Sequence, residues 1–151
     1  MFSNNKKIAL LYILSIFFIS LDRFAKIYFV KTKGTIDIVS DYLSLNYAEN
    51  PYIAFSIPIS PNLIKYISLL LGLLIIFYFV KFFKTNKQFY AYPLFALILG
   101  SFSNIYDRFR YGFVIDYINL RYFTIFNIAD SLIFLSIIFL SISLYKVDKK
   151  N

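Results

Sequence analysis

The sequence predicts an all-α membrane protein: a four-transmembrane-helix bundle with a small extracytoplasmic β-sheet, in one domain over residues 1–151. Of the 151 residues, 60% are hydrophobic, and the mean hydropathy is +0.67. A soluble domain is about 45–50% apolar, so one globular core would not bury this much apolar surface. The apolar residues are grouped into long runs with lysines at their ends, a pattern typical of membrane-surface anchors.

Four runs have about the length that crosses a membrane. A helix rises about 1.5 Å per residue, so roughly 20 residues cross a hydrocarbon layer of about 30 Å. The runs lack the period-two alternation of membrane β-barrel strands. We expect spans at about residues 8–29, 63–80, 89–106 and 123–144. The first run resembles a signal peptide, but Asp22, Arg23 and Phe24 follow it instead of small residues, so we expect an uncleaved span.

Two segments connect the spans on the side opposite the termini. In the first, residues 31–60, β-prone residues alternate around Ile36, Ile38 and 42–47, which predicts a small sheet. The second, residues 107–122, is amphipathic and rich in tyrosines that suit a membrane interface. Positive charges are divided evenly between the two sides. The short lysine-dense segment "KFFKTNK" nevertheless favours cytoplasmic termini.

Polar residues recur at helical spacing near the ends of three spans. They form three clusters: Asp22 with Lys26 in the first span, Asn104 with Asp107 and Arg108 in the third, and Asn127 with Asp130 in the fourth. The first and third spans run outward and the fourth runs inward, so all three clusters lie near one membrane surface. Ionisable groups at such a depth cost a few kcal/mol. The sequence therefore indicates a shared polar site between helices.

Structural explanations remain open for some of these residues. Asp22 and Lys26 can form an ion pair at a helix end, Asp107 and Arg108 can pair locally, and Asn127 can cap the fourth helix. Simple solvation explains Asp130 less well, because it lies further inside its span. A second acid, Asp116, lies in the apolar strip "FVIDYI", where a solvated loop acid would have polar neighbours.

The residue types restrict the possible chemistry. The chain has no Cys and no His, which excludes disulfides, thiol catalysis, zinc sites built on these residues and Ser-His machinery. Acid–base work then falls to carboxylates, Lys or Tyr. Two carboxylates in a poorly hydrated site share one proton, as in aspartic proteases. By placement, Asp116 and Asp130 are the candidate pair.

Four short motifs occur in order along the chain. "LDRFAK" has an Asp followed four residues later by a Lys, and "NPYIAFS" keeps Asn50, Ala54 and Phe55 of a pattern N-x-G-A-A-F, with Tyr52 and Ile53 at the small positions. Of the pattern G-N-hydrophobic-x-D-R-x-x-x-G-x-V-x-D-F, "SNIYDRFRYGFVIDY" has Ser103 in place of the Gly and keeps Asn104, Asp107, Arg108, Gly112, Val114 and Asp116. "FNIAD" follows F-N-x-A-D. Together they resemble the motifs of bacterial lipoprotein signal peptidase (signal peptidase II) over nearly the full chain.

The resemblance implies a multi-pass enzyme of the bacterial cytoplasmic membrane, with cytoplasmic termini and an extracytoplasmic β-sheet cradle. It implies Asp116 and Asp130 as a catalytic dyad near the outer face, with no metal or cofactor. The substrate would be a diacylglyceryl-modified prolipoprotein, cut just before its lipidated Cys. We expect a monomer among membrane lipids. The substrate-binding or supporting residues would be Asp22, Lys26, Asn50, Ala54, Asn104, Asp107, Arg108, Asn127 and Ala129.

Two other functions are compatible with intramembrane carboxylates. A proton- or ion-coupled carrier needs polar groups at several depths, whereas these lie near one surface. A non-catalytic scaffold does not require Asp130. A nucleic-acid partner is not expected despite the net charge of +8, because the sequence lacks a basic stripe on one face.

Overall fold

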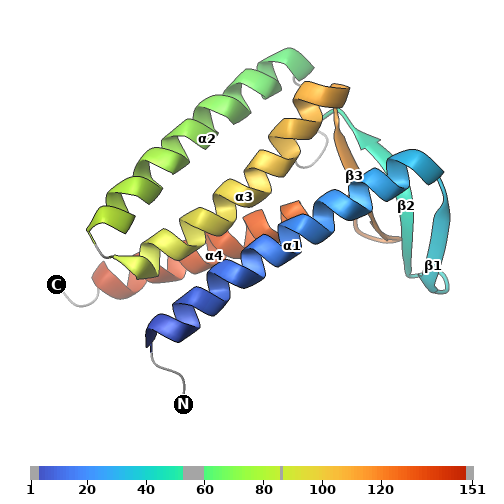
Figure 1. Cartoon of the computed structure of the whole chain (residues 1–151). Coiled ribbons are helices and arrows are strands. Elements are labelled where there is room, and N and C mark those ends of the chain that lie inside the picture. The colour runs from blue at the N-terminus through green and yellow to red at the C-terminus, as the bar shows by residue number, and fades with distance from the viewer. Residues whose placement is uncertain (1–3, 53–59, 86, 149–151) are drawn as a thin grey trace.

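The computed structural model describes residues 4–52, 60–85 and 87–148 (Figure 1). Its elements are α1 (Asn4–Thr32), β1 (Thr35–Val39), β2 (Leu43–Asn50), α2 (Pro61–Lys84), α3 (Gln88–Tyr111), β3 (Val114–Leu120), β4 (Ile125–Phe126) and α4 (Ile128–Asp148). Within these ranges, α1, α2 and α4 contain stretches that are long and apolar enough to cross a membrane. The protein is therefore mostly helical and has the apolar spans of a multi-pass membrane protein.

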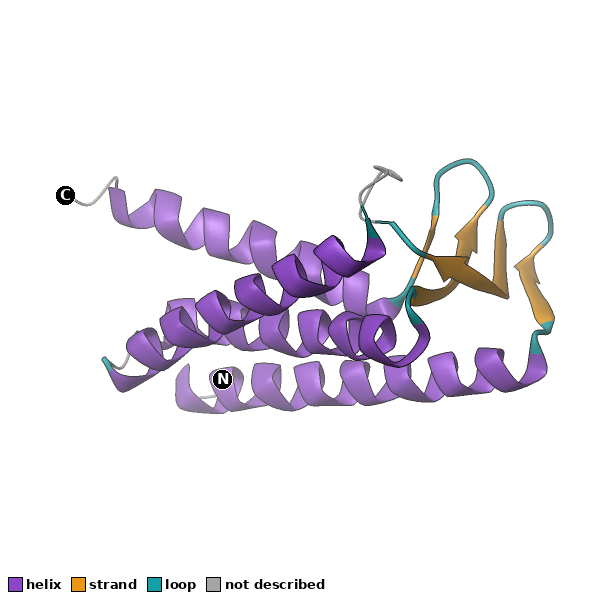
Figure 2. Ribbon diagram, turned by 90° about the horizontal axis from the view of Figure 1, so that it is seen from above, coloured by secondary structure: helices purple, strands orange, loops and turns teal. Residues whose placement is uncertain are grey.

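The central helix, α3, packs against α1, α2 and α4. The four strands form one antiparallel sheet in the order β1-β2-β3-β4. The sheet lies at one end of the helices, and Figure 2 shows the beginning of α1 and the end of α4 at the opposite end. The polar clusters predicted from the sequence lie in the parts of α1, α3 and α4 that are nearest the sheet (Figure 1).

Helix α1 is mostly polar on its buried face and mostly apolar on its exposed face. Its buried residues, Ser15, Asp22, Lys26 and Phe29, follow helical spacing along one stripe. Large apolar side chains such as Phe24, which is 69% exposed, point outward. A soluble helix has the reverse arrangement, so α1 is suited to apolar surroundings outside and polar partners inside.

The prediction that the fourth span begins near residue 123 is wrong. Ile125 and Phe126 form β4, which pairs with Asn119 and Ile118 of β3, so their backbone groups belong to the sheet. The helix begins only at Ile128. Its start is set by the Asn127 side chain, which accepts the backbone N–H of Asp130.

The third helix also extends beyond the predicted boundary at residue 106. Helix α3 continues to Tyr111 and ends at Gly112, whose φ of +89° is the left-handed conformation that commonly terminates helices. Asn104, Asp107 and Arg108 therefore all lie on regular helix, which puts their side chains on neighbouring positions of one face.

The small sheet predicted in the first outer segment is confirmed as the β1–β2 hairpin. Strand β3, from the second outer segment, was not predicted. Its first four residues, from Val114 to Tyr117, are all buried, so it lacks the alternation of a half-exposed strand. The pairing of β2 with β3 brings the two outer segments into one sheet above the helices.

Candidate active site

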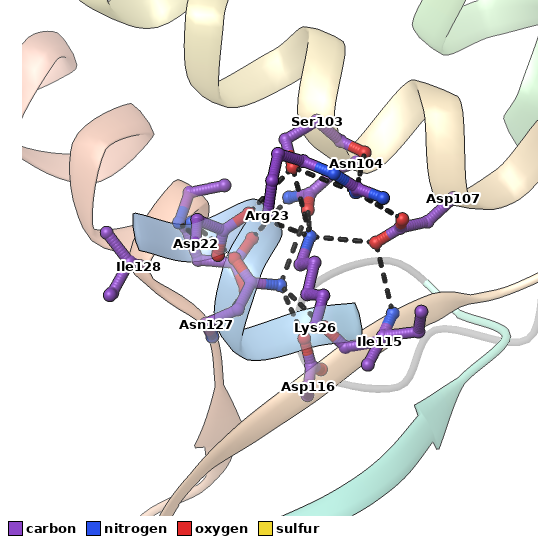
Figure 3. Close-up of polar contacts among 12 residues, drawn as sticks. Asp22, Arg23, Lys26, Ser103, Asn104, Asp107, Ile115, Asp116, Asn127 and Ile128 are labelled. Atoms are coloured by element: carbon purple, nitrogen blue, oxygen red, sulfur yellow. Dashed lines mark hydrogen bonds and ion pairs between the residues drawn. The ribbon is translucent and has the colours of Figure 1, made fainter. Parts of the chain in front are cut away.

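Lys26 occupies the centre of a buried polar cluster between α1 and α3 (Figure 3). Its Nζ lies 3.3 Å from Asp22 Oδ2 and 2.8 Å from Asp107 Oδ2, and all three side chains are fully buried. Nζ also donates to Asn104 Oδ1 at 2.8 Å. The i,i+4 ion pair inferred from the sequence is thus present. It belongs to a larger network that compensates the cost of burying each charge.

Asp107 ties three elements together. It accepts from Arg23 on α1 at 2.6 Å through Oδ1, and from the backbone N–H of Ile115 on β3 at 3.4 Å through Oδ2. With the Lys26 contact, one carboxylate on α3 fixes α1 on one side and β3 on the other. The strand that carries Asp116 is therefore held directly against the helices.

Asn127 caps α4, as one of the open explanations predicted. Its Oδ1 accepts the backbone N–H of Asp130 at 2.8 Å, and Asp130 Oδ2 accepts the backbone N–H of Asn127 at 3.2 Å. This reciprocal pair is a capping box with Asp in the place of the usual Glu. Asn127 also donates through Nδ2 to Asp116 Oδ1 at 2.6 Å. One residue therefore contacts both candidate carboxylates.

Asp116 is 1% exposed and accepts a second amide, Asn50 Nδ2, at 2.9 Å. The sheet register explains this contact. Asn50 pairs with Val114, so Asp116 is its diagonal neighbour on the next strand. Burial, together with the nearby charge of Asp130, raises the pKa of Asp116 to about 7, although hydrogen bonds from Asn50 and Asn127 act in the opposite direction.

Asp130 and Asp116 belong to the same hydrogen-bond network. Asn104 donates to Asp130 Oδ1 at 2.7 Å, and its own Oδ1 accepts from both Lys26 and Asn127. Asp130 lies in the first turn of α4, where the helix N-terminus favours negative charge. Such an arrangement, two carboxylates with shared donors and limited water, can hold one proton between the acids.

The structure brings most of the sequence-predicted residues into this site. Arg108 is half-buried, and its charge interacts with those of Asp130, Asp116 and Asp107. Ala129 is fully buried and donates its backbone N–H to Asp22 at 3.2 Å. Ala54 lies outside the described residues.

Three members of the network were not predicted from the sequence: Arg23, Ser103 and Tyr117. The sequence carried a signal for Ser103, because it lies four residues before Asp107 and so on the same face of the helix. Tyr117 gave no such signal, because its contacts depend on the sheet. Within the described ranges, no group of three His, Cys, Asp or Glu residues is arranged to hold a metal ion.

Comparisons with known proteins agree with this architecture. A family model described as Signal peptidase (SPase) II matches residues 14–146. The lipoprotein signal peptidase of Clostridium novyi (strain NT) is 34% identical over 143 residues, covering 89% of this chain and 96% of the relative. That of Clostridium tetani (strain Massachusetts / E88) is 33% identical over 138 residues, covering 86% of this chain and 88% of the relative.

The fold is also similar to that of a solved protein. A bacterial membrane enzyme, whose structure was determined by the in meso method at 2.3 Å resolution, superposes with a TM-score of 0.78 at 24% identity, covering 95% of this chain and 92% of the other. The family model covers most of the sequence, and the polar network contains the Asp and Asn residues of three of the four motifs and Asn50 of the remaining one. The chain belongs to the signal peptidase II family.

Proposed function

We propose that this protein is an aspartic endopeptidase that removes the signal peptide from diacylglyceryl-modified prolipoproteins, cutting just before the lipidated Cys. Asp116 and Asp130 form its catalytic dyad. The observation that carries the proposal is the pair of contacts made by Asn127, which donates to Asp116 through its side chain and to Asp130 through its backbone. Two acids from different elements are thereby held in one site.

The dyad activates water by acid–base catalysis. With its pKa raised to about 7, Asp116 is about half protonated at neutral pH, and in the reactive form it holds the shared proton while Asp130 is the ionised partner. Asp130 takes a proton from a water molecule as the water oxygen attacks the scissile carbonyl carbon, while Asp116 gives its proton to the carbonyl oxygen. The proton on Asp130 then passes to the leaving amine, and Asp116 recovers its proton as the carbonyl re-forms.

The charges around the dyad favour this state. Asp22 and Asp107 are balanced by Lys26 and Arg23 through the ion pairs already described. Arg108 remains to interact with the dyad. A dyad that holds one proton carries a single negative charge, which the Arg108 charge balances, so a singly protonated dyad leaves this group of residues neutral.

The proposal includes an arrangement of the chain in the membrane. All four helices cross the bacterial cytoplasmic membrane, including α3, whose polar residues Ser103, Asn104 and Asp107 are buried. The lysine-rich end of α2, with Lys81 and Lys84, lies at the same end of the molecule as the start of α1 (Figure 1), which favours cytoplasmic termini. The dyad is then near the outer face, where a monomer receives a lipid-modified substrate from the bilayer and water from outside.

The proposal is tested with purified protein and a diacylated prolipoprotein. Asp116→Asn and Asp130→Asn should each lower the cleavage rate at least about 100-fold, the lower end for loss of an acid–base group. Asp37→Asn makes the same chemical change at an exposed carboxylate on β1, so it should retain the parental rate. Retention of more than a tenth of the parental rate by either dyad variant contradicts the assignment.

A further inference from the structure

Tyr117 is the residue directly after Asp116, and it is buried to 2% exposure. Its ring stacks on Phe29 of α1, with centroids 5.7 Å apart and planes inclined by 12°. Its hydroxyl donates to Asp22 Oδ1 at 3.0 Å and accepts the backbone N–H of Ile128 at 3.3 Å. One oxygen atom on β3 therefore contacts both α1 and the first residue of α4.

The beginning of α4 is held by three side chains from outside the helix. The first N–H groups of a helix have no partners within it. Here the N–H of Ile128 meets the Tyr117 hydroxyl, that of Ala129 meets Asp22 Oδ1 at 3.2 Å, and that of Asp130 meets Asn127 Oδ1 at 2.8 Å. Tyr117 acts on two of these three contacts, because it also binds the carboxylate that accepts from Ala129.

We propose that Tyr117 is a positioning residue that fixes the strand of Asp116 relative to the helix of Asp130. The inference rests on the proposed function, in which those two acids react together. Tyr117 is covalently adjacent to one acid, and its hydroxyl binds the helix two residues before the other. It adds a second link between β3 and α4 beside that of Asn127.

The Tyr117 hydroxyl keeps its proton for this role. Burial raises the pKa of Tyr117 above its ordinary value of 10.0, and the neighbouring charge of Asp22 raises it further. The group therefore stays protonated at physiological pH and can donate to Asp22 there.

The position of α4 affects the chemistry through the charge of Asp130, which contributes to the raised pKa of Asp116. Coulomb interactions weaken with distance. For charges about 5 Å apart in an effective dielectric of about 20, moving them about 1 Å further apart lowers the pKa by roughly 0.4. Loss of the Tyr117 hydroxyl should therefore move the alkaline limb of the kcat/KM profile to lower pH.

The test compares Tyr117→Phe with Ser103→Ala. Each variant removes one hydroxyl donor to the Asp22 carboxylate, since Ser103 Oγ donates to Asp22 Oδ2 at 2.7 Å. The other contacts of the Ser103 hydroxyl are with Arg23 and Lys26 of α1, so this variant leaves the β3–α4 link intact. The measurements are kcat, KM and the pH dependence of kcat/KM on a diacylated prolipoprotein.

Tyr117→Phe should lower kcat roughly tenfold with little change in KM, because misplaced reacting groups impair the chemical step more than binding. Its alkaline limb should shift by roughly 0.4 pH unit to the acid side, while that of Ser103→Ala keeps the parental position. A parental kcat and pH limb in Tyr117→Phe overturns the proposal. Equal shifts in both variants also overturn it, because they would report only a missing donor on Asp22.

Two further results separate this inference from the proposed function. Carbon NMR titration of the Asp116 carboxyl should show the same acid shift in Tyr117→Phe without any measurement of activity. An unshifted titration refutes the positioning role even if the dyad is correct. Retention of more than a tenth of the parental rate by Asp116→Asn or Asp130→Asn refutes the proposed function, whatever Tyr117→Phe does.

Discussion

Replacement of Asp116 by Asn should make the protein more stable at alkaline pH while abolishing cleavage. Asp116 is 1% exposed, and its pKa is raised from 3.8 to about 7. A carboxyl group whose pKa is raised by folding contributes fully to stability when the pH is below its pKa in the unfolded protein. This contribution is lost as the pH rises through its pKa in the folded protein. The shift of about three pKa units corresponds to about 4 kcal/mol lost between pH 4 and pH 8.

The Asn side chain removes this penalty but disturbs two hydrogen bonds. Each oxygen of the Asp116 carboxylate accepts from one side-chain amide, Asn50 or Asn127. The amide that replaces it has only one oxygen and can accept from only one of these two donors. The mismatch costs roughly 1 kcal/mol. We therefore expect Asp116→Asn to be about 1 kcal/mol less stable than the parent at pH 4 and about 3 kcal/mol more stable at pH 8.

Equilibrium unfolding in detergent micelles at pH 4, 6 and 8 measures this difference. Tyrosine fluorescence suits the assay, because the chain has 14 Tyr and no Trp. Asp37→Asn, at an exposed position, should follow the parental curve at each pH. A constant loss of stability in Asp116→Asn across the range would refute the reasoning, because it would mean that ionisation of Asp116 is not penalised by the fold.

Two other substitutions probe the framework of the site. Gly100→Ala should lower kcat, because the added Cβ would lie 2.8 Å from the Ala129 carbonyl oxygen and would displace α4. A parental kcat in this variant would contradict the prediction. Lys26→Met should destabilise the protein by about 3–5 kcal/mol in the same unfolding assay, because Asp22 and Asp107 lose the ammonium group that bridges them. Parental stability in this variant would show that the bridge is dispensable.

Helical spacing predicted the polar contacts that depend on one element at a time. Asp22 and Lys26 are four residues apart, so the helix alone places them together. The cap formed by Asn127 was open to prediction for the same reason, since a capping residue and its target are neighbours in sequence. The direction of each span then placed the clusters at one end of the molecule.

Contacts that depend on the sheet could not be predicted in this way. Asn50 reaches Asp116 only in the observed register of β2 on β3, and a bulge between Leu45 and Ala48 alters that register along the strand. A shift by one residue would turn every side chain of β3 to the opposite face. The sequence carries no local signal for the bulge, so pairing between distant segments had to come from the structure.

The interior of this protein specifies its structure mainly through polar contacts. A helix that leaves its neighbours for the surrounding lipid keeps apolar contacts, so apolar packing alone does little to fix its position. A polar group that loses its partner in these apolar surroundings is costly. Among the described residues, every buried side-chain nitrogen and oxygen has a hydrogen-bond partner. The Asp22 carboxylate accepts hydrogen bonds from the Ser103 hydroxyl, the Tyr117 hydroxyl and the N–H of Ala129, which belong to three different elements. Displacement of α3, β3 or α4 would leave a buried donor or acceptor unpaired, so the same network that places the two acids also keeps them in place.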